Sequence, residues 1–235
     1  MEQNKLIDRC IQLIKIVDSV YYLYEKLLLK NDDYKELNKI NLNKIRVDDV
    51  FKNYVIDKEF NMYIQFYIRS FNMFSIYEGL QIENIFNQLE KIYFIRQARY
   101  RTKAIESVNE KLNIYTNKKE NGKIKIKKCL NDLFGVRFVI INYNEIRNEF
   151  IDFLDEHMKE ISSFNSKVKF TVKGYGEVNA PYIADHIYYS SKLYNNIFPM
   201  ELQIWDNNNM ELNEKSHKEY KRGYKNWSNQ YNNIR

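Results

Sequence analysis

Glycine and proline are rare in this chain, which has six glycines and two prolines among its 235 residues. These residues most often mark turns, and an all-β sandwich needs a turn after every short strand. So few of them argue against a sandwich and exclude collagen-like and linker-like chains. Hydrophobic residues make up 44% of the sequence, which argues against wholesale disorder. We therefore expect a core that needs no disulfide or metal to hold it.

Charge and cysteine usage narrow the class of protein further. Lysine and arginine number 37 against 31 acidic residues, so the net charge is +6. A mild basic excess suits a nucleotide or RNA partner, although many other proteins share it. Cys10 and Cys129 form neither a CxxC pair nor a metal spacing, which favours a reduced, cytoplasmic protein. We expect no membrane span and no signal peptide, because no sufficiently long apolar run occurs.

The first part of the chain has a helical pattern. Apolar residues recur at three- and four-residue steps over residues 5–30, which predicts an amphipathic helix. Residues 31–45 are polar and predict a break, and helical periodicity then returns from Asp48 to about Gln97, interrupted near residues 77–79. Two stripes of large side chains, which we interpret as core packing, are Phe60, Ile64, Tyr67 and Phe71, then Ile82, Ile85, Phe86 and Leu89.

The character of the sequence changes in its second half. Residues 103–115 predict one more helix, and residues 116–128 predict a charged loop with no core pattern. Beyond the loop, β-branched and aromatic runs predict strands at 136–141, 168–172, about 187–193 and 200–205. Helices are expected at 145–160 and 211–227. The sequence thus predicts an α+β fold, with a helical N-terminal extension (1–94) packed on a catalytic domain (95–235).

A group of basic residues accompanies the predicted helix at 103–115. Lys103, Ser107 and Lys111 are four residues apart and share one helix face, and Arg101 stands at or just before the helix start. Two ammonium groups beside a hydroxyl suit phosphate, as do the backbone N–H groups of a helix start. The alternative is a solvated basic face, which the spacing alone favours.

Two acidic residues are associated with predicted strands. Asp132 comes just before the strand at 136–141, with Arg137 five residues later; such a carboxylate suits Mg²⁺, although it also suits a turn. Alternation in the last strand puts Glu201, Gln203 and Trp205 on one face. An acid, an amide and an indole on one face suit the wall of a cleft that holds metal, nucleotide and acceptor. The alternative is an exposed sheet face on which the last helix covers the indole.

A tyrosine and a histidine stand in a stretch that we interpret as a loop. Tyr182 can stack on a base, and His186 can contact phosphate or ribose hydroxyls, although a lone histidine is more often structural. Asn213, His217 and Lys221 share one face of the last predicted helix. They either contact the cleft or brace the sheet.

Together and in this order, the motifs resemble the synthetase domain of RelA/SpoT proteins. The pieces are an RxKxxxSxxxK helix, a DLxGVR strand, a YxxxH loop, an ELQIW strand and a following NExSHxxYK segment. The resemblance covers roughly residues 95–225, and its specificity lies in the order of five motifs. No motif covers the N-terminal helices, for which three roles stay open: covering the ATP cleft, binding a neutralising antitoxin, or assembly.

The resemblance implies a fold similar to nucleotidyltransferases, with a mixed sheet flanked by helices. It also implies transfer of the β,γ-diphosphate of ATP to a ribose 3′-hydroxyl, with release of AMP. By motif position, Arg101 and Arg137 would sandwich the adenine. Lys103, Ser107 and Lys111 would hold the ATP phosphates.

The same resemblance implies roles for the metal and the acceptor. Asp132 and Glu201 would bind Mg²⁺. Glu201, aided by Gln203, would activate the acceptor hydroxyl. Tyr182 would stack on the acceptor base, and His186 would contact the acceptor's sugar or phosphate.

The acceptor motif departs from the usual form of the family. The family reads GYRS or GYRG before its histidine, whereas this chain reads Pro181-Tyr182-Ile183-Ala184. Ile183 thus replaces an arginine by which many members handle a guanine nucleotide, which puts GDP or GTP as acceptor in doubt. The sequence has no HD hydrolase signature, so we expect a small, stand-alone member.

The form of the last two motifs looks most like the toxic small alarmone synthetases of toxin–antitoxin systems, some of which modify the 3′ CCA end of tRNA. The sequence therefore predicts a toxin-type pyrophosphokinase that acts on tRNA, inhibits translation and has an antitoxin partner. The alternatives are a (p)ppGpp or (p)ppApp synthetase acting on a free nucleotide, and a non-catalytic RNA- or protein-binding module. The basic residues that would receive tRNA are Lys123, Lys125, Lys127 and Lys128, with Lys218, Lys221, Arg222 and Lys225.

Overall fold

The computed structural model describes residues 2–31, 34, 40–77, 94–117, 120–161, 165–175 and 180–219. Several residues singled out from the sequence lie outside the described residues, namely Ile82, Ile85, Phe86, Leu89, Lys221, Arg222 and Lys225. Among the described residues, no helix is both long and apolar enough to cross a membrane.

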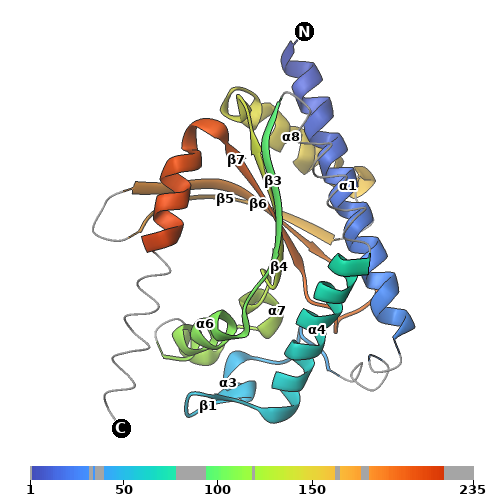
Figure 1. Ribbon diagram of the computed structural model, residues 1–235, viewed down its shortest axis with the longest axis vertical. Helices are drawn as coiled ribbons and strands as arrows, with labels where there is room; N and C mark the ends of the chain where they lie inside the picture. The colour runs from blue at the N-terminus through green and yellow to red at the C-terminus, as the bar shows by residue number, and fades with distance from the viewer. Residues whose placement is uncertain are drawn as a thin grey trace.

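A five-stranded mixed sheet forms the centre of the fold (Figure 1). Its strands are β3 (Ile95–Thr102), β4 (Phe134–Ile140), β5 (Asn165–Tyr175), β6 (Ala180–Ser190) and β7 (Met200–Asp206). They lie in the order β3-β4-β7-β6-β5, in which β4 and β7 pair in parallel and the other pairs are antiparallel. The predicted α+β class with a mixed sheet is confirmed.

Helices cover both sides of this sheet. The long ones are α1 (Glu2–Lys30), α4 (Lys58–Tyr77), α6 (Ile105–Asn117) and α8 (Tyr143–Ile161). Short elements are α3 (Val47–Val50), η1 (Glu120–Gly122), α7 (Ile126–Cys129) and η2 (Asn207–Asn209). Residues 210–219 form a further helix, drawn in orange-red on the side of the sheet away from α1 (Figure 1). The helices predicted at 5–30, 103–115 and 145–160 are confirmed, as is the described part of the last one.

One face of the sheet, which we call the apolar face, packs against the N-terminal helices. Strand alternation places on it residues of β4, β6 and β7, namely Phe134, Val136, Phe138, Ile187, Tyr189, Met200, Leu202 and Ile204. The predicted stripe of α4 is buried in the same core. Phe134 shows how closely the parts join, because its ring centroid lies 4.4 Å from that of Phe71 and 5.1 Å from that of Tyr24. The core is therefore continuous from the helices into the sheet.

Tyrosine hydroxyls join the N-terminal helices to the segment that leads into β7. Tyr21 of α1 donates to the carbonyl of Phe198 at 2.8 Å. Tyr63 and Tyr67 of α4 both donate to the carbonyl of Asn196. These tyrosines are fully buried, so the bonds satisfy hydroxyl and carbonyl groups that water does not reach. The connection before β7 is thus fixed by side chains from far away in the sequence.

The helical pattern predicted from Asp48 to Gln97 is wrong at both ends. Residues 51–56 form a hairpin of β1 (Phe51–Lys52) and β2 (Val55–Ile56). Its turn residues, Asn53 and Tyr54, have φ values of 50° and 65°, which is the backbone of a tight hairpin turn usually made with glycine. A turn built without glycine gives no clear signal in the sequence.

The other end of that predicted helix belongs to β3. A bulge between Ile95 and Gln97 breaks the alternation of this edge strand, and its burial pattern has no clean period of two. Because β3 extends to Thr102, Arg101 lies in a strand opposite Gly135, and not at a helix start. Lys103 likewise precedes α6, so it does not share a helix face with Lys111 as predicted.

Two further predictions are corrected by burial and strand bounds. The segment 116–128 does contribute to the core, because Ile124 and Ile126 are buried there while Lys123 and Lys125 stay exposed. The stretch that holds Tyr182, interpreted as a loop, is part of β6, which starts before residue 187 and ends at Ser190. In both segments apolar and polar residues alternate as in a partly buried strand or edge. The many charges of the first and the many aromatic residues of the second led to the wrong predictions.

Candidate functional site

Two lysines and an aspartate meet at the end of the β3–β4 pair. The last paired residues of these strands are Thr102 and Phe134. The backbone N–H of Lys103 donates to the carbonyl of Leu133 at 2.8 Å, which places Lys103 beside Asp132. Lys103 Nζ then lies 2.6 Å from Asp132 Oδ2, and Lys111 Nζ lies 2.9 Å from Asp132 Oδ1. The pairing of two strands therefore creates this charge cluster.

The charges of this cluster interact strongly because their side chains are largely buried. The side chains of Lys103 and Lys111 are 17% exposed and that of Asp132 is 15% exposed. Burial alone would raise the pKa of Asp132, but the ammonium groups outweigh it and hold the pKa well below its usual value. For Lys103 burial prevails and lowers the pKa, whereas for Lys111 the attraction of Asp132 prevails and raises it. The cluster is an ion triad with one excess positive charge.

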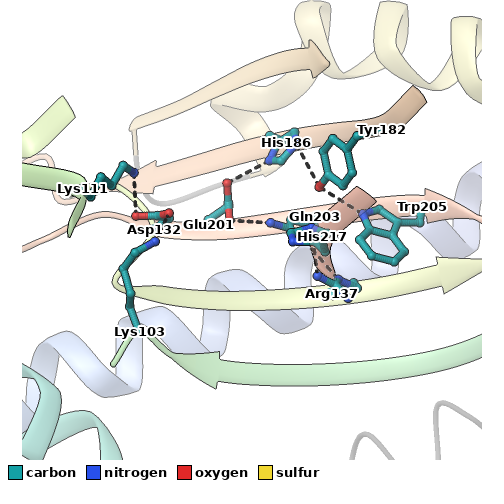
Figure 2. Close-up of polar contacts among 10 residues, drawn as sticks. All are labelled: Lys103, Lys111, Asp132, Arg137, Tyr182, His186, Glu201, Gln203, Trp205 and His217. Atoms are coloured by element: carbon teal, nitrogen blue, oxygen red, sulfur yellow. Dashed lines mark hydrogen bonds and ion pairs between the residues drawn. The ribbon is translucent and has the colours of Figure 1, made fainter. Parts of the chain in front are cut away.

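A second polar cluster lies on the face of the sheet opposite the apolar face, which we call the polar face (Figure 2). Its residues come from β4, β6 and β7: Arg137, Tyr182, His186, Glu201, Gln203 and Trp205. His186 Nδ1 lies 2.8 Å from Glu201 Oε1, and Gln203 Nε2 donates to Glu201 Oε2 at 2.7 Å. Burial raises the pKa of Glu201, but the hydrogen bond and charge of His186 leave it below its usual value. Glu201 is thus held as a carboxylate.

The contacts of the polar face close into a ring. Arg137 Nε donates to Gln203 Oε1 at 3.1 Å, and the guanidinium carbon lies 3.6 Å from the centre of the Trp205 ring. Trp205 Nε1 donates to the Tyr182 hydroxyl at 3.3 Å, and that hydroxyl is 3.5 Å from His186 Nε2. Each member is therefore oriented from two sides (Figure 2).

A cavity of about 260 Å³ adjoins this ring on the side of β3. Its lining includes Arg99, Arg101, Arg137, Gln203 and Glu214. Arg137 Nη1 lies 3.1 Å from Glu214 Oε1, and burial lowers the pKa of Arg137 to about 10. Arg101 is exposed, and its side chain lies over Gly135. A planar, partly anionic molecule is the ligand that such a lining suits.

The helix at 210–219 covers part of the polar face. Asn213 bonds both the N–H and the C=O of Ile183 at 2.8 Å, which fixes it to β6. The ring centre of His217 lies 5.6 Å from that of Trp205 and 4.9 Å from that of Tyr182. Tyr182 is consequently only 5% exposed. The sheet-bracing alternative thus holds for Asn213, and the covering of Trp205 by the last helix is observed.

The structure brings most of the predicted residues into two adjacent groups. Asp132, Lys103 and Lys111 form the ion triad, and Glu201, Gln203, His186, Tyr182 and Arg137 belong to the ring. The groups are close enough for the charge of Asp132 to offset part of the lowering of the Glu201 pKa by His186. Ser107 is half-buried on α6, one turn before Lys111.

Arg99 was missed from the sequence, although it lines the cavity and lies 3.7 Å from Glu214. It stands directly opposite Arg137 in the β3–β4 pairing. Arg99 and Arg101 are two residues apart, as side chains on one face of a strand are, and this spacing could have identified Arg99. The bulge in β3 and the helix predicted for this segment obscured that signal.

The carboxylates of the site would suit a magnesium ion that is also coordinated by the phosphates of a ligand. Among the described residues, no group of three or more His, Cys, Asp or Glu side chains is arranged to hold a metal. Mg²⁺ in phosphoryl-transfer sites is commonly held by one or two carboxylates plus substrate phosphates and water. Asp132 and Glu201 supply two such carboxylates.

Comparison with known proteins adds little to this site. No family model matches the chain, and no curated protein matches it. Among solved structures, the chain is similar to the crystal structure of small alarmone synthetase 1 from Bacillus subtilis bound to its product pppGpp. The identity is 14%, the likeness covers 71% of this chain and 98% of that one, and the TM-score is 0.31. A likeness this weak leaves fold and function to be argued from the chain's own geometry.

Proposed function

We propose that the protein is an ATP-dependent pyrophosphokinase that transfers the β,γ-diphosphate of ATP to a ribose 3′-hydroxyl, with the 3′ CCA end of tRNA as acceptor. The observation that carries the proposal is the position of the ion triad beside the ring that holds Glu201. One group offers two ammonium ions for phosphate, and the other offers a buried carboxylate for a hydroxyl proton. Phosphoryl transfer requires little more than positioning and charge neutralisation.

The ATP end of the reaction would use residues of the triad and the cavity. Lys103 and Lys111 would turn from Asp132 to the phosphates. Ser107, one helical turn before Lys111 on α6, would also contact them. Arg101 and Arg137 would enclose the adenine, because both line the cavity. Charge-assisted hydrogen bonds to phosphate are stronger than neutral ones, so the lysines would contribute most of the binding.

The transfer step would take place between the two groups. Asp132 and Glu201 would hold Mg²⁺, which would neutralise phosphate charge when bound. Glu201 would accept the proton of the 3′-hydroxyl as that oxygen bonds to the β-phosphorus and the bond to the oxygen of AMP breaks. Gln203 would position Glu201 by its bond to Oε2, and His186 would keep the other oxygen oriented towards β6. General-base catalysis of this kind typically contributes about 10²–10⁴-fold.

The backbone pairing of β5 with β6 bears on the acceptor end of the site, because the sequence of β5 contains three lysines. By register, Lys167, Lys169 and Lys173 of the edge strand β5 stand opposite Tyr188, His186 and Tyr182. A basic edge strand beside the base and sugar positions suits a polynucleotide more than a free nucleotide. The ring of His217 now packs against the aromatic ring of Tyr182. For Tyr182 to stack on the acceptor base, His217 and the helix at 210–219 must first move away from it.

The rest of the proposed landing surface is uneven. Lys123, Lys125, Lys128 and Lys218 are exposed. Lys127 is half-buried, and burial lowers its pKa, so it contributes less to such a surface.

The proposal also includes the division of the chain into residues 1–94 and 95–235. The first part would support β7 and would be the docking site for an antitoxin.

A single assay tests the acceptor. ATP labelled in the γ-phosphate is incubated with the protein and either tRNA, GDP, GTP or an adenine nucleotide, and the products are separated. We expect label in tRNA together with equimolar AMP, and a rate of labelling about 10²–10⁴-fold lower with Glu201→Gln. Unlabelled tRNA in reactions that consume ATP would overturn the tRNA proposal, and a labelled free nucleotide would favour alarmone synthesis. Growth inhibition unchanged by Glu201→Ala would favour the non-catalytic module instead.

A further inference from the structure

The pairing of Asp132 with two lysines is the feature of the site that the proposed reaction does not explain. Both of its carboxylate oxygens, the atoms that would bind a metal, already face an ammonium group, at 2.6 Å and 2.9 Å. The three side chains are at most 17% exposed, so water and salt screen these charges weakly. A cation that approached Asp132 would meet two positive charges of the protein first.

We propose that the Lys103–Asp132–Lys111 triad is a lock, which keeps Asp132 closed to a free divalent cation until phosphates draw the two lysines away. A polyphosphate carries several negative charges, so it competes well with one carboxylate for the two ammonium groups. Once they bind phosphate, Asp132 is left as an uncompensated buried carboxylate, which a divalent cation neutralises. The nucleotide half of this inference rests on the proposed function, whereas the exclusion of free metal does not.

The backbone around the triad confines the opening of the lock to side-chain motion. Lys103 is fixed by its N–H bond to Leu133 at the start of β4. Lys111 lies on α6, which is anchored in the core by the fully buried Val108 and Leu112. Neither lysine can therefore leave Asp132 without a rotation of its own side chain. Metal and nucleotide affinities become positively coupled, and by linkage each raises the other by the same factor.

Titration of the full chain with Mn²⁺ alone, followed by electron paramagnetic resonance, tests the lock without any nucleotide. We expect Lys103→Met to bind Mn²⁺ at least about tenfold more tightly than the wild type, because one of two repelling charges is gone. Lys111→Met serves as an independent second variant with the same expectation. Lys15→Met, an exposed lysine of α1, is the matched control and should behave as the wild type. Adding Asp132→Asn to Lys103→Met should abolish the gain.

One result with these variants would overturn the lock, namely no gain in Mn²⁺ affinity over the wild type in either lysine variant when circular dichroism shows both to be folded. If neither variant folds, the wild type decides: α,β-methylene-ATP, once calorimetry shows that it binds, must raise the Mn²⁺ affinity at least about tenfold, and an unchanged affinity overturns the lock.

The proposed function fails in a different way from the lock. A protein that binds no α,β-methylene-ATP and labels no acceptor would remove the pyrophosphokinase proposal. A tighter Mn²⁺ site in Lys103→Met would still support the lock in that case, because that measurement contains no nucleotide.

Discussion

The two faces of β7 alternate along the same seven residues, yet their polar atoms are satisfied in opposite ways. Around the apolar face, tyrosine hydroxyls bond to backbone carbonyls, as Tyr63 and Tyr67 do at Asn196. On the polar face, side chains bond to one another, as Gln203 and His186 do at Glu201. A side chain that bonds to the backbone mainly fixes the fold, whereas a ring of mutually bonded side chains fixes groups that remain chemically active. Substitutions on the two faces should therefore affect different measurements.

The largest effect is expected at Glu201, on the polar face. Glu201→Gln keeps the shape and removes the base, so the rate of diphosphate transfer should fall by about 10²–10⁴-fold. The free energy of unfolding should change little, because the amide can still accept from Gln203. Transfer assays and thermal unfolding measure the two quantities on the same sample. A folded variant with wild-type activity would contradict the assignment of Glu201 as the base.

The neighbouring residue on the apolar face should show the reverse behaviour. Leu202 is fully buried, so Leu202→Ala should lower the free energy of unfolding by about 2–5 kcal/mol. The transfer rate per folded molecule should remain close to wild type. Leu202→Met, which conserves volume, is the control and should cost less than about 1.5 kcal/mol. A fall in rate as large as that of Glu201→Gln would show that the two faces are not independent.

The tyrosine bonds to Asn196 should affect stability by a smaller amount. The double change Tyr63→Phe and Tyr67→Phe leaves a buried carbonyl without its donors, which should cost about 1–3 kcal/mol in chemical denaturation. Tyr189→Phe is a matched control, since Tyr189 is fully buried and its hydroxyl finds no partner in the described part of the chain. That control should be neutral or slightly stabilising. Equal losses in both proteins would mean that the bonds to Asn196 do not fix the connection.

Arginine substitutions on the two sides of the sheet should separate binding from stability. Arg137→Lys loses the planar contact with Trp205 and the bond to Gln203, so the ATP KM should rise by roughly five- to tenfold. Arg147→Lys loses the paired bonds to Asp185, at 2.8 Å and 2.9 Å, and should lower stability by about 1 kcal/mol with an unchanged KM. Steady-state kinetics with ATP distinguishes them. An unchanged KM in Arg137→Lys would place ATP elsewhere.

Alternation predicted the two faces of β7 because one face packs on the apolar core while the other carries polar side chains. Met200, Leu202 and Ile204 do lie on the apolar face, while Glu201 and Gln203 lie on the other. The helix of residues 5–30 was equally predictable from its apolar spacing. These features depend only on neighbours in the sequence.

The ion triad depended on an element that the sequence concealed. Asp132 and Lys103 meet because β3 pairs with β4, and the bulge near Ile95 hides β3 from a periodicity argument. The hairpin turn at Asn53 and Tyr54 was concealed for a similar reason, since its backbone is usual for glycine and the residues are not. Long-range pairing and unusual backbone decide such cases, and neither has a local signature.

The smallest effect concerns the two cysteine thiols of the hydrophobic core. Cys10 and Cys129 are free and buried, and burial raises the pKa of each to about 12. At pH 9, where about half or more of an exposed thiol is thiolate, only about one part in a thousand should be thiolate here. Iodoacetamide should therefore label the native protein slowly and the urea-unfolded protein fast, which mass spectrometry can follow at each cysteine.

The same shift sets the direction of a pH effect on stability. The folded protein holds each thiol proton more tightly than the unfolded chain does, so this contribution is complete below pH 9 and is lost as the pH rises towards 12. The two cysteines also report on different places, because Cys10 lies on α1 whereas Cys129 is near enough to feel the charges of Lys111 and Asp132. Fast native labelling of Cys129 alone would mean that the core opens beside the triad while the α1 packing stays closed.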